Sequence, residues 1–259
     1  MKILKIIICI IFILHIAACD HIEDRRGEPA DAVVSITATL PKTPSATETP
    51  QGTDSSPQQT ENPPVEDIIE YDNEWAFYLI NPENRLPDDF TVELVNIGGR
   101  FDLDVRVAEY ALRMIADAKD DGLELIVAGA YRSIQRQREL FESRVNALKQ
   151  AGHSADEAHR LTALEYALPG ASEHNAGLAI DILSNSHPNP TRAFDQSAEF
   201  EWLINNCFKY GFILRYPDEK THITGIMYEP WHYRFVGVQR AHEIHESGLT
   251  LEEFILALE

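Results

Sequence analysis

Residues 172–181 read SEHNAGLAID, a polar turn that runs directly into an apolar strand pattern. His174 and Asp181 are seven positions apart, so on one continuous strand their side chains would point to opposite faces. Gly177 lies between them and allows the backbone to turn. The stretch therefore predicts a turn followed by a strand, with an imidazole and a carboxylate brought to the same side.

A second polar cluster, residues 229–234, reads EPWHYR. Its His232, together with His174 and Asp181, completes a set of two imidazoles and one carboxylate, which suits a catalytic zinc with one open position. Glu229 is a spare carboxylate, and a zinc hydrolase needs such a group to take a proton from water. Residue types and spacing alone leave another interpretation open, because a lone histidine is more often a core or surface residue than a ligand.

The chain around these clusters mixes helical and strand patterns without strict alternation. A helical apolar period covers 104–119, and further helices are expected after the capping residues Ser133, Ser154 and Thr250 and over 198–210. Strands are expected at 123–128, 178–183, 212–216, 222–228 and 232–236. Because the last strands follow one another closely, the pattern predicts an α+β fold with a mostly antiparallel sheet and flanking helices.

Composition excludes several classes of protein. The 259 residues include 22 basic and 42 acidic side chains, for a net charge of -20. Nucleic acid is not an expected partner, because phosphate binding needs clustered lysine and arginine. A hydrophobic content of 44% with ordinary aromatic content excludes a wholly disordered chain, and three cysteines exclude a disulfide scaffold.

The N-terminus, residues 1–19, predicts export. Lys2 and Lys5 precede an apolar run over 6–18, which is shorter than the roughly 20 residues of a membrane span and typical of a secretory signal. The run ends in Ile-Ala-Ala-Cys19, which resembles a bacterial lipobox although Ile stands where Leu is commonest. A diacylated Cys19 would anchor the protein stably to the outer face of the bacterial cytoplasmic membrane. An ordinary signal peptide or an uncleaved anchor remains the alternative.

The rest of the chain divides into a tether and one folded domain. Residues 20–65 lack apolar periodicity and are rich in Pro, Thr, Ser and Gln, so they are expected to form a disordered tether. Residues 66–259 are long enough for one core, and the domain is expected to be monomeric. Cys207 lies in an apolar helical pattern, which favours a core residue over a nucleophile. His242 and His245 are expected on a solvated helix face.

The two polar clusters resemble the SxHxxGxAxD and ExWH motifs of the D-alanyl-D-alanine carboxypeptidases of the VanY type, within the lysostaphin and hedgehog zinc-peptidase group. The resemblance covers roughly residues 75–259 and continues outside the motifs, for example at 131–133 and 211–217. One departure is Ala130, where the family has glycine. The resemblance implies a hedgehog-like, D,D-peptidase-like zinc-peptidase fold.

The resemblance also implies residue roles. Zinc would be bound by His174, Asp181 and His232, with Glu229 as the general base. Three more residues are implied in substrate binding, namely Arg132, Gln137 and Ser172. Arg132 would also stabilise charge at the scissile carbonyl. An arginine at the mouth of a site can clamp a carboxylate or an oxyanion. The alternatives are a surface ion pair for Arg132 and a turn or capping residue for Ser172.

The sequence thus predicts a zinc-dependent carboxypeptidase that removes the C-terminal D-Ala from peptidoglycan stem peptides. An L,D-carboxypeptidase or a peptidoglycan endopeptidase would carry the same site residues and remains open. A non-catalytic cell-wall binding module is a further alternative. It would be signalled by a missing ligand or base, and none is missing here.

Overall fold

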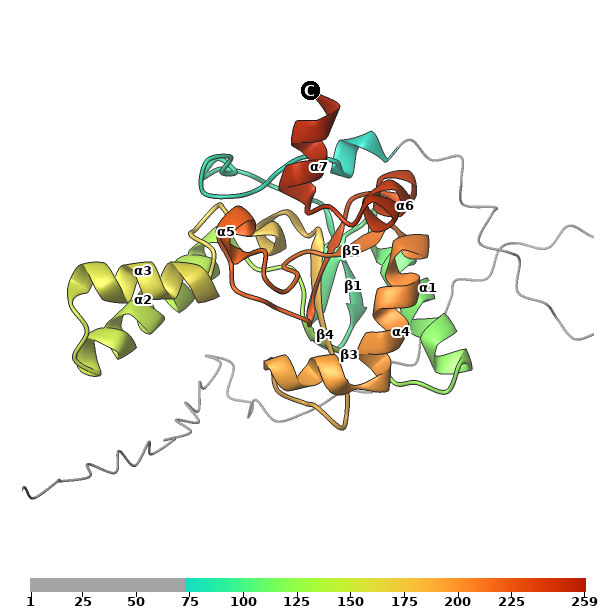
Figure 1. The fold of residues 1–259 in the computed structure, drawn as a ribbon, viewed down its shortest axis with the longest axis horizontal. Helices are drawn as coiled ribbons and strands as arrows, with labels where there is room; N and C mark the ends of the chain where they lie inside the picture. Colours follow the sequence, from blue (N-terminus) through green and yellow to red (C-terminus); the bar gives the residue numbers. More distant parts are fainter. Residues whose placement is uncertain (1–72) are drawn as a thin grey trace, which may run out of the picture. The chain divides into compact units, whose positions relative to one another are not determined.

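The computed structural model describes residues 73–259 (Figure 1). The predicted signal peptide, Cys19, the tether and the first residues of the predicted domain lie outside the described residues. Across residues 73–259, none of the helices combines the length and the apolar character that crossing a bilayer requires.

A four-stranded sheet lies at the centre of the fold, in the order β3-β4-β6-β5, and all neighbouring strands are antiparallel. The predicted α+β class with an antiparallel sheet is therefore confirmed. Asp181 on β4 lies directly opposite His232 on β6. Residues paired in this way share one face of the sheet, so the register alone brings these two side chains together. The strands are β3 (Ile126–Gly129), β4 (Ala179–Leu183), β5 (Phe212–Leu214) and β6 (His232–Phe235).

A two-stranded hairpin, β1 (Leu94–Gly98) and β2 (Phe101–Asp104), was not anticipated from the sequence. It contacts the polar turn that precedes β4, because the Asp104 N–H donates to the Gly177 carbonyl at 3.1 Å. The Tyr131 N–H, just after β3, donates to the Asp102 carbonyl at 2.8 Å. The hairpin therefore supports the turn of the first polar cluster and the loop that carries Arg132.

Helices surround the sheet, and three of them begin where capping residues were predicted. Ser133 and Ser154 accept the N–H groups of Arg136 and Glu157, and Thr250 forms a full capping box with Glu253. The helices are α1 (Ala108–Asp120), α2 (Ile134–Gln150), α3 (Ala155–Glu165), α4 (Ala198–Asn206), α5 (Thr221–Thr224), α6 (Val238–Ser247) and α7 (Leu251–Leu258).

The strand predicted over 222–228 is wrong. The chain instead forms the short helix α5, in which the N–H groups of Ile223 and Gly225 donate to the carbonyls of Lys220 and Thr221. Gly225 ends it in the left-handed region at φ 75°, a conformation that breaks an extended strand. Local β-branched content therefore misled the strand prediction at this point.

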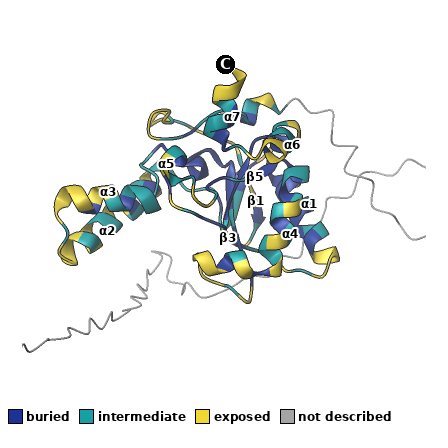
Figure 2. Cartoon of the chain, viewed as in Figure 1, coloured by how far each residue is buried: buried dark blue, intermediate teal, exposed yellow. Residues whose placement is uncertain are grey.

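Helices α2 and α3 lie side by side and project away from the sheet in Figure 1. Arg144 and Glu165 join the two helices through a bidentate ion pair at 2.7 and 2.8 Å. Figure 2 shows that their outer ends are exposed, whereas the central sheet is buried. This pair, called here the helical hairpin, is thus anchored at its inner end, next to the polar motifs.

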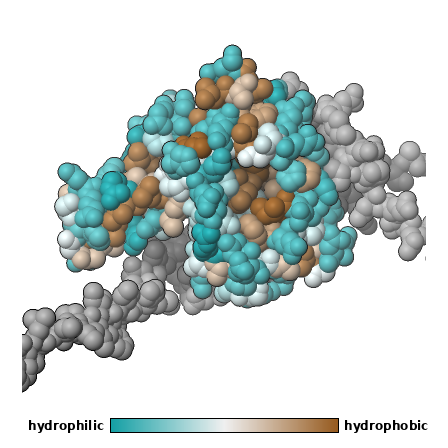
Figure 3. Space-filling view, viewed as in Figure 1, coloured by the Kyte–Doolittle hydropathy of each residue, from teal (hydrophilic) through white to brown (hydrophobic). Residues whose placement is uncertain are grey.

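The core has two parts. The larger packs the sheet against α1, and it includes Cys207, which is buried as predicted. The smaller lies between β5, α6 and α7. In Figure 3 the apolar atoms at the top of this face lie over α7, where Leu256 and Leu258 are exposed. His245 is exposed but stacks on Phe208 with ring centres 3.8 Å apart, so it packs rather than projecting freely into solvent.

Candidate active site

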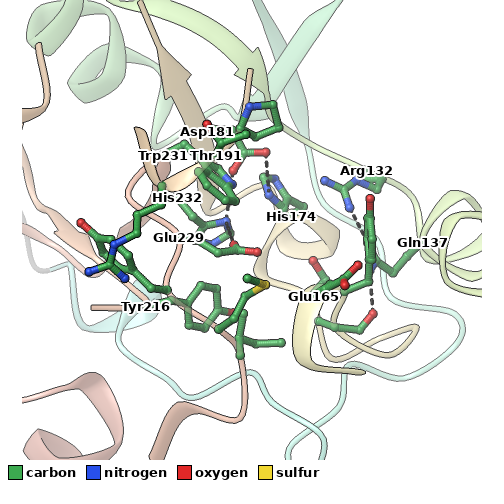
Figure 4. Close-up of a pocket in the computed structure, with 18 residues that line it drawn as sticks. Arg132, Gln137, Glu165, His174, Asp181, Thr191, Tyr216, Glu229, Trp231 and His232 are labelled. Atoms are coloured by element: carbon green, nitrogen blue, oxygen red, sulfur yellow. Dashed lines mark hydrogen bonds and ion pairs between the residues drawn. The ribbon is translucent and has the colours of Figure 1, made fainter. Parts of the chain in front are cut away.

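Three side chains form the one group of potential metal ligands found within residues 73–259: His174, Asp181 and His232, whose ligand atoms all lie within 4.8 Å of one another. His174 Nε2 is 3.3 Å from Asp181 Oδ2, and His232 Nδ1 is 3.1 Å from Asp181 Oδ1. Ligands about 2.1 Å from a tetrahedral zinc lie about 3.4 Å from each other. The two distances to Asp181 are close to this spacing, so the donor set and its geometry fit a zinc ion (Figure 4).

The turn that carries His174 has the predicted form. Residues Glu173–Ala176 make a single 3-10 turn that ends at Gly177 with φ 67°. A Cβ at this glycine would also lie 2.7 Å from the Asp104 nitrogen, so the turn needs glycine for two separate reasons. The chain then enters β4, and Asp181 reaches the same side as His174.

The two histidines present different ring nitrogens to the site. His174 Nδ1 lies 2.7 Å from the Ala130 carbonyl, which can only accept a hydrogen bond. That bond places the His174 proton on Nδ1 and leaves Nε2 as the ligand atom. His232 is oriented the other way, with Nδ1 towards Asp181 and Nε2 3.2 Å from Glu173 Oε2.

Gly129 on β3 makes room for the Asp181 carboxylate. A Cβ built at this position would lie only 2.2 Å from Asp181 Oδ2, well inside van der Waals contact. The pairing of β3 with β4 is irregular here, because the register shifts between Val127 and Gly129. Sequence reasoning did not single out Gly129, since the need for it arises only from the partner strand.

The charges around the group favour a bound cation. Burial alone would raise the pKa of Asp181, but the two imidazoles hold it well below its usual range. Burial alone would lower the pKa of His232, yet hydrogen bonds to the carboxylates of Asp181 and Glu173 raise it to about 9. Burial lowers the pKa of His174, which keeps that ring neutral and able to bind a metal.

Glu229 lies beside the ligands without being one of them. Its carboxylate Oε2 is 3.8 Å from His232 Nδ1, and the residue is 9% exposed. A turn fixes this placement, because the His232 N–H donates to the Glu229 carbonyl while the Glu229 N–H donates to Tyr216. Burial is the main cause that raises the pKa of Glu229 to about 8. Such a carboxylate is suited to accept and return protons near neutral pH.

Arg132 and Gln137 lie together on the side of the cavity away from Glu229, with His174 between (Figure 4). Arg132 Nη1 donates to Gln137 Oε1 at 2.8 Å, and Gln137 Nε2 donates to the Ala167 carbonyl at 2.6 Å. Gln137 is 1% exposed, so both ends of its amide are occupied within the protein. It holds Arg132 in place and also lines the cavity, so the substrate contact predicted from the sequence stays a prediction.

These residues line one cavity of about 580 Å³, to which Ser172 also contributes. Ser172 is buried at the start of the 3-10 turn, where its carbonyl accepts the Asn175 N–H at 3.0 Å while its hydroxyl makes no capping hydrogen bond. All seven predicted residues therefore meet at one place. The cavity extends past them to a further wall of Glu165, Tyr166, Arg192, Tyr216, Met227 and Tyr228.

Asn175 was overlooked in the sequence. Its Nδ2 donates to the Arg132 carbonyl at 2.6 Å and its Oδ1 accepts from the Gly170 N–H at 3.1 Å. The Arg132 N–H in turn donates to the His174 carbonyl at 3.0 Å. Asn175 thus ties the arginine loop to the metal turn. Its position inside the motif was the available signal, but an asparagine in a polar turn has many ordinary explanations.

Comparison with known proteins agrees with this geometry. The family model described as VanY, D-alanyl-D-alanine carboxypeptidase, matches residues 100–238. The chain belongs to the VanY D-alanyl-D-alanine carboxypeptidase family. A D-alanyl-D-alanine carboxypeptidase of Enterococcus faecalis is 36% identical over 185 residues, covering 71% of this chain and 67% of the relative. The predicted family and class of enzyme, a zinc metallopeptidase, are therefore confirmed.

Solved structures of VanY-family relatives share the fold. One is a vancomycin resistance D,D-pentapeptidase VanY in complex with Zn(II), 36% identical with a TM-score of 0.63, covering 70% of this chain and 99% of that one. Another is the LdcB LD-carboxypeptidase, 34% identical with a TM-score of 0.62, covering 71% of this chain and 86% of that one. The predicted zinc-peptidase fold and zinc cofactor are thereby confirmed at the level of the family.

Proposed function

We propose that this VanY-family chain is a zinc-dependent D,D-carboxypeptidase that removes the terminal D-Ala from peptidoglycan stem peptides. The observation that carries the proposal is the grouping of three metal ligands, a buried spare carboxylate and an arginine around one cavity. A binding module would need the cavity and the arginine but not Glu229. The carboxylate 3.8 Å from a ligand nitrogen is the feature that favours hydrolysis over binding.

The chain's own residues supply positioning and proton transfer. A zinc ion held by the three ligands supplies Lewis acidity, which polarises the scissile carbonyl and makes water easier to deprotonate. Glu229 takes a proton from the attacking water and returns it to the nitrogen of the departing D-Ala as the peptide bond breaks. Arg132 offers guanidinium N–H groups to the developing negative charge on the carbonyl oxygen. Trp231 lines the same cavity beside Glu229 and helps to shield the proton transfer from bulk water.

Arg132 also favours cleavage at a chain end over cleavage inside a peptide. Within residues 73–259 its one side-chain partner is Gln137, bound through Nη1, which leaves its other N–H groups for substrate. A guanidinium prefers a bidentate carboxylate, and only the terminal residue of a stem peptide offers a main-chain carboxylate there. An endopeptidase would instead have to accommodate further residues at this position.

An L,D-carboxypeptidase is the second candidate, because the structural relatives include an LD-carboxypeptidase of the same fold. Purified chain incubated with stems ending as tripeptide, tetrapeptide and pentapeptide separates the possibilities by product mass. We expect loss of one D-Ala from the pentapeptide and no loss from the tetrapeptide. Loss from the tetrapeptide alone would establish the L,D activity, and absence of any cleavage by zinc-loaded chain would favour a binding module.

We further propose that Cys19 carries the lipid and that residues 20–65 give the domain reach from the membrane. The support is the small-residue run before Cys19 and the Pro, Ser and Thr content after it. The full gene expressed in bacteria should yield a membrane-associated protein with a diacylated N-terminal Cys19, seen by mass spectrometry. Cys19→Ala should abolish the acylation. Acylated, membrane-bound Cys19→Ala protein would contradict this placement.

A further inference from the structure

Glu173 lies inside the first motif, yet neither the motif nor the proposed mechanism gives it a role. Its side chain is fully buried, and its two oxygens contact different partners. Oε1 accepts from Arg215 Nε at 2.6 Å and from Arg234 Nη1 at 2.9 Å. Oε2 lies 3.2 Å from Nε2 of His232, the ring nitrogen that points away from Asp181.

Two buried arginines face this carboxylate. Arg215 and Arg234 can only donate, and both donate to Oε1, so Glu173 is the acceptor in each of these hydrogen bonds. The arginines are themselves fixed, since Arg215 forms a bidentate pair with Glu252 of α7 at 2.5 and 2.9 Å. Arg234 donates to the carbonyls of Ala76 and Tyr78. Glu173 is therefore held rigidly in a form that can only accept hydrogen bonds.

An acceptor at this place determines which nitrogen of His232 carries the proton. A neutral imidazole has one N–H and one lone pair, and the N–H is found where the acceptor is. Both nitrogens of His232 face a carboxylate, with Asp181 Oδ1 3.1 Å from Nδ1 and Glu173 Oε2 3.2 Å from Nε2. Because Asp181 is one of the three metal ligands, a zinc ion beside it would take the Nδ1 lone pair, and the ring proton would then lie on Nε2, where Glu173 accepts it. For His174 the Ala130 carbonyl has the equivalent effect on the opposite nitrogen.

We propose that Glu173 is a positioning residue that fixes the Nε2–H form of His232 and so makes Nδ1 the metal-binding atom. The inference rests on the zinc site of the proposed function and deepens it. Carboxylate partners of metal-binding histidines orient the ring and raise its basicity, and their loss typically weakens metal binding about 10–100-fold. Through its two arginines, Glu173 thus connects the carbonyls of Ala76 and Tyr78 and helix α7 to one ligand of the metal.

Replacement by glutamine tests this point sharply. In Glu173→Gln the amide oxygen must face Arg215 and Arg234, because both arginines only donate. The amide NH2 then faces His232 Nε2 and can only donate to it, so Nε2 must act as the acceptor. The ring proton therefore moves to Nδ1, which can then no longer bind the metal. The shape and most of the packing are kept, so the expected defect is in metal binding.

The matched control is Glu252→Gln, which weakens the same ion network at its outer end without touching His232. Zinc affinity of the full chain is measured by competition with a chelating dye, alongside thermal unfolding. We expect zinc binding about 10–100-fold weaker for Glu173→Gln and changed by no more than about threefold for Glu252→Gln. A purely structural network would instead lower the unfolding temperature of both variants and leave the zinc affinity of folded protein unchanged.

A measurement on the parent protein makes the test independent of whether the variant folds. Nitrogen NMR of the ring of His232 in the zinc-loaded chain should show a protonated Nε2. A protonated Nδ1 would overturn the proposal, as would a folded Glu173→Gln protein with parental zinc affinity. A parent that binds no zinc at all would contradict the proposed function itself, which separates the two failures.

Discussion

The two walls of the cavity are built differently. The metal wall consists of His174, Asp181, His232 and Glu229, carried by β4, β6 and the tight turns that precede them. The arginine wall consists of Arg132 and Gln137 with Glu165, carried by the loop after β3 and by the helical hairpin.

Strand register and buried charge pairs hold the metal wall, whereas a few hydrogen bonds and one partly exposed ion pair hold the arginine wall. The wall that would hold the metal is therefore built on the buried central sheet. The wall that would read the substrate lies on a projecting element, where sequence can change without disturbing the sheet. Substitutions on the two walls should accordingly have separable effects on the metal and on the substrate.

The largest effect is expected on the metal wall, at a ligand. His232→Ala removes one of three ligands, so the zinc content should fall from about one per chain to near zero and D-Ala release should fall to background. A chelator should do the same to the parent, and added zinc should restore only the parent. His222→Ala, an exposed histidine outside the cavity, is the control. Full zinc content in His232→Ala would break the assignment of this wall.

The next effect concerns a residue that touches no substrate. Gly129→Ala places a methyl group 2.2 Å from Asp181 Oδ2, so the carboxylate must move away. We expect zinc affinity to fall by about 10–100-fold, as when a ligand loses its orientation. The exposed neighbour Ala128→Ser should leave it unchanged. An unchanged affinity in Gly129→Ala would show that the Asp181 carboxylate is not confined by β3.

On the arginine wall the metal should be retained. Gln137→Ala removes the acceptor that orients Arg132, and hydrogen bonds to charged groups contribute about 1.5–3 kcal/mol. The expected result is a loss of about 10–100-fold in kcat/KM with the zinc content of the parent. Gln135→Ala, exposed on the same helix, should behave as the parent. Zinc loss in Gln137→Ala would mean that the two walls are not separable.

The smallest effect is expected at the joint of the helical hairpin. Arg144→Ala removes the ion pair with Glu165. The two side chains are 39% and 32% exposed, so the pair contributes only about 0.2–1 kcal/mol of free energy. KM should rise a few-fold at low salt, and the difference should shrink at high salt because of screening. Arg136→Ala breaks an exposed pair on the outer surface and should leave KM unchanged. A large loss of turnover in Arg144→Ala would mean that the helical hairpin takes part in the catalytic step.

The parts of the site that could be predicted were those encoded in short stretches of chain. The turn at Gly177, the strand after it and the helix caps at Ser133 and Thr250 depend on neighbouring residues, and they form as expected. The site residues could be named together because two short motifs contain most of them. Local patterns did not reveal the hairpin formed by β1 and β2, because its strands span only five and four residues.

The unpredicted parts depend on contacts between distant residues. In the sequence alone, Glu173 has the character of a solvated loop residue. In the structure it is paired with Arg215 and Arg234, which are 42 and 61 positions away along the chain. Gly129 matters only because Asp181 lies on the neighbouring strand. The hydrogen bond from the Gln137 amide to the Ala167 carbonyl, 30 positions away, could not be read from the sequence either.

One substitution tests the proposed chemistry most directly. Glu229→Gln keeps the shape of the side chain but removes its ability to take a proton, and general-base catalysis is typically worth about 10²–10⁴-fold. D-Ala release from a pentapeptide stem and zinc content are measured on the same sample. The account predicts turnover reduced by about that factor with zinc retained. Turnover within a few-fold of the parent, or loss of the zinc, would contradict the division between three ligands and one base.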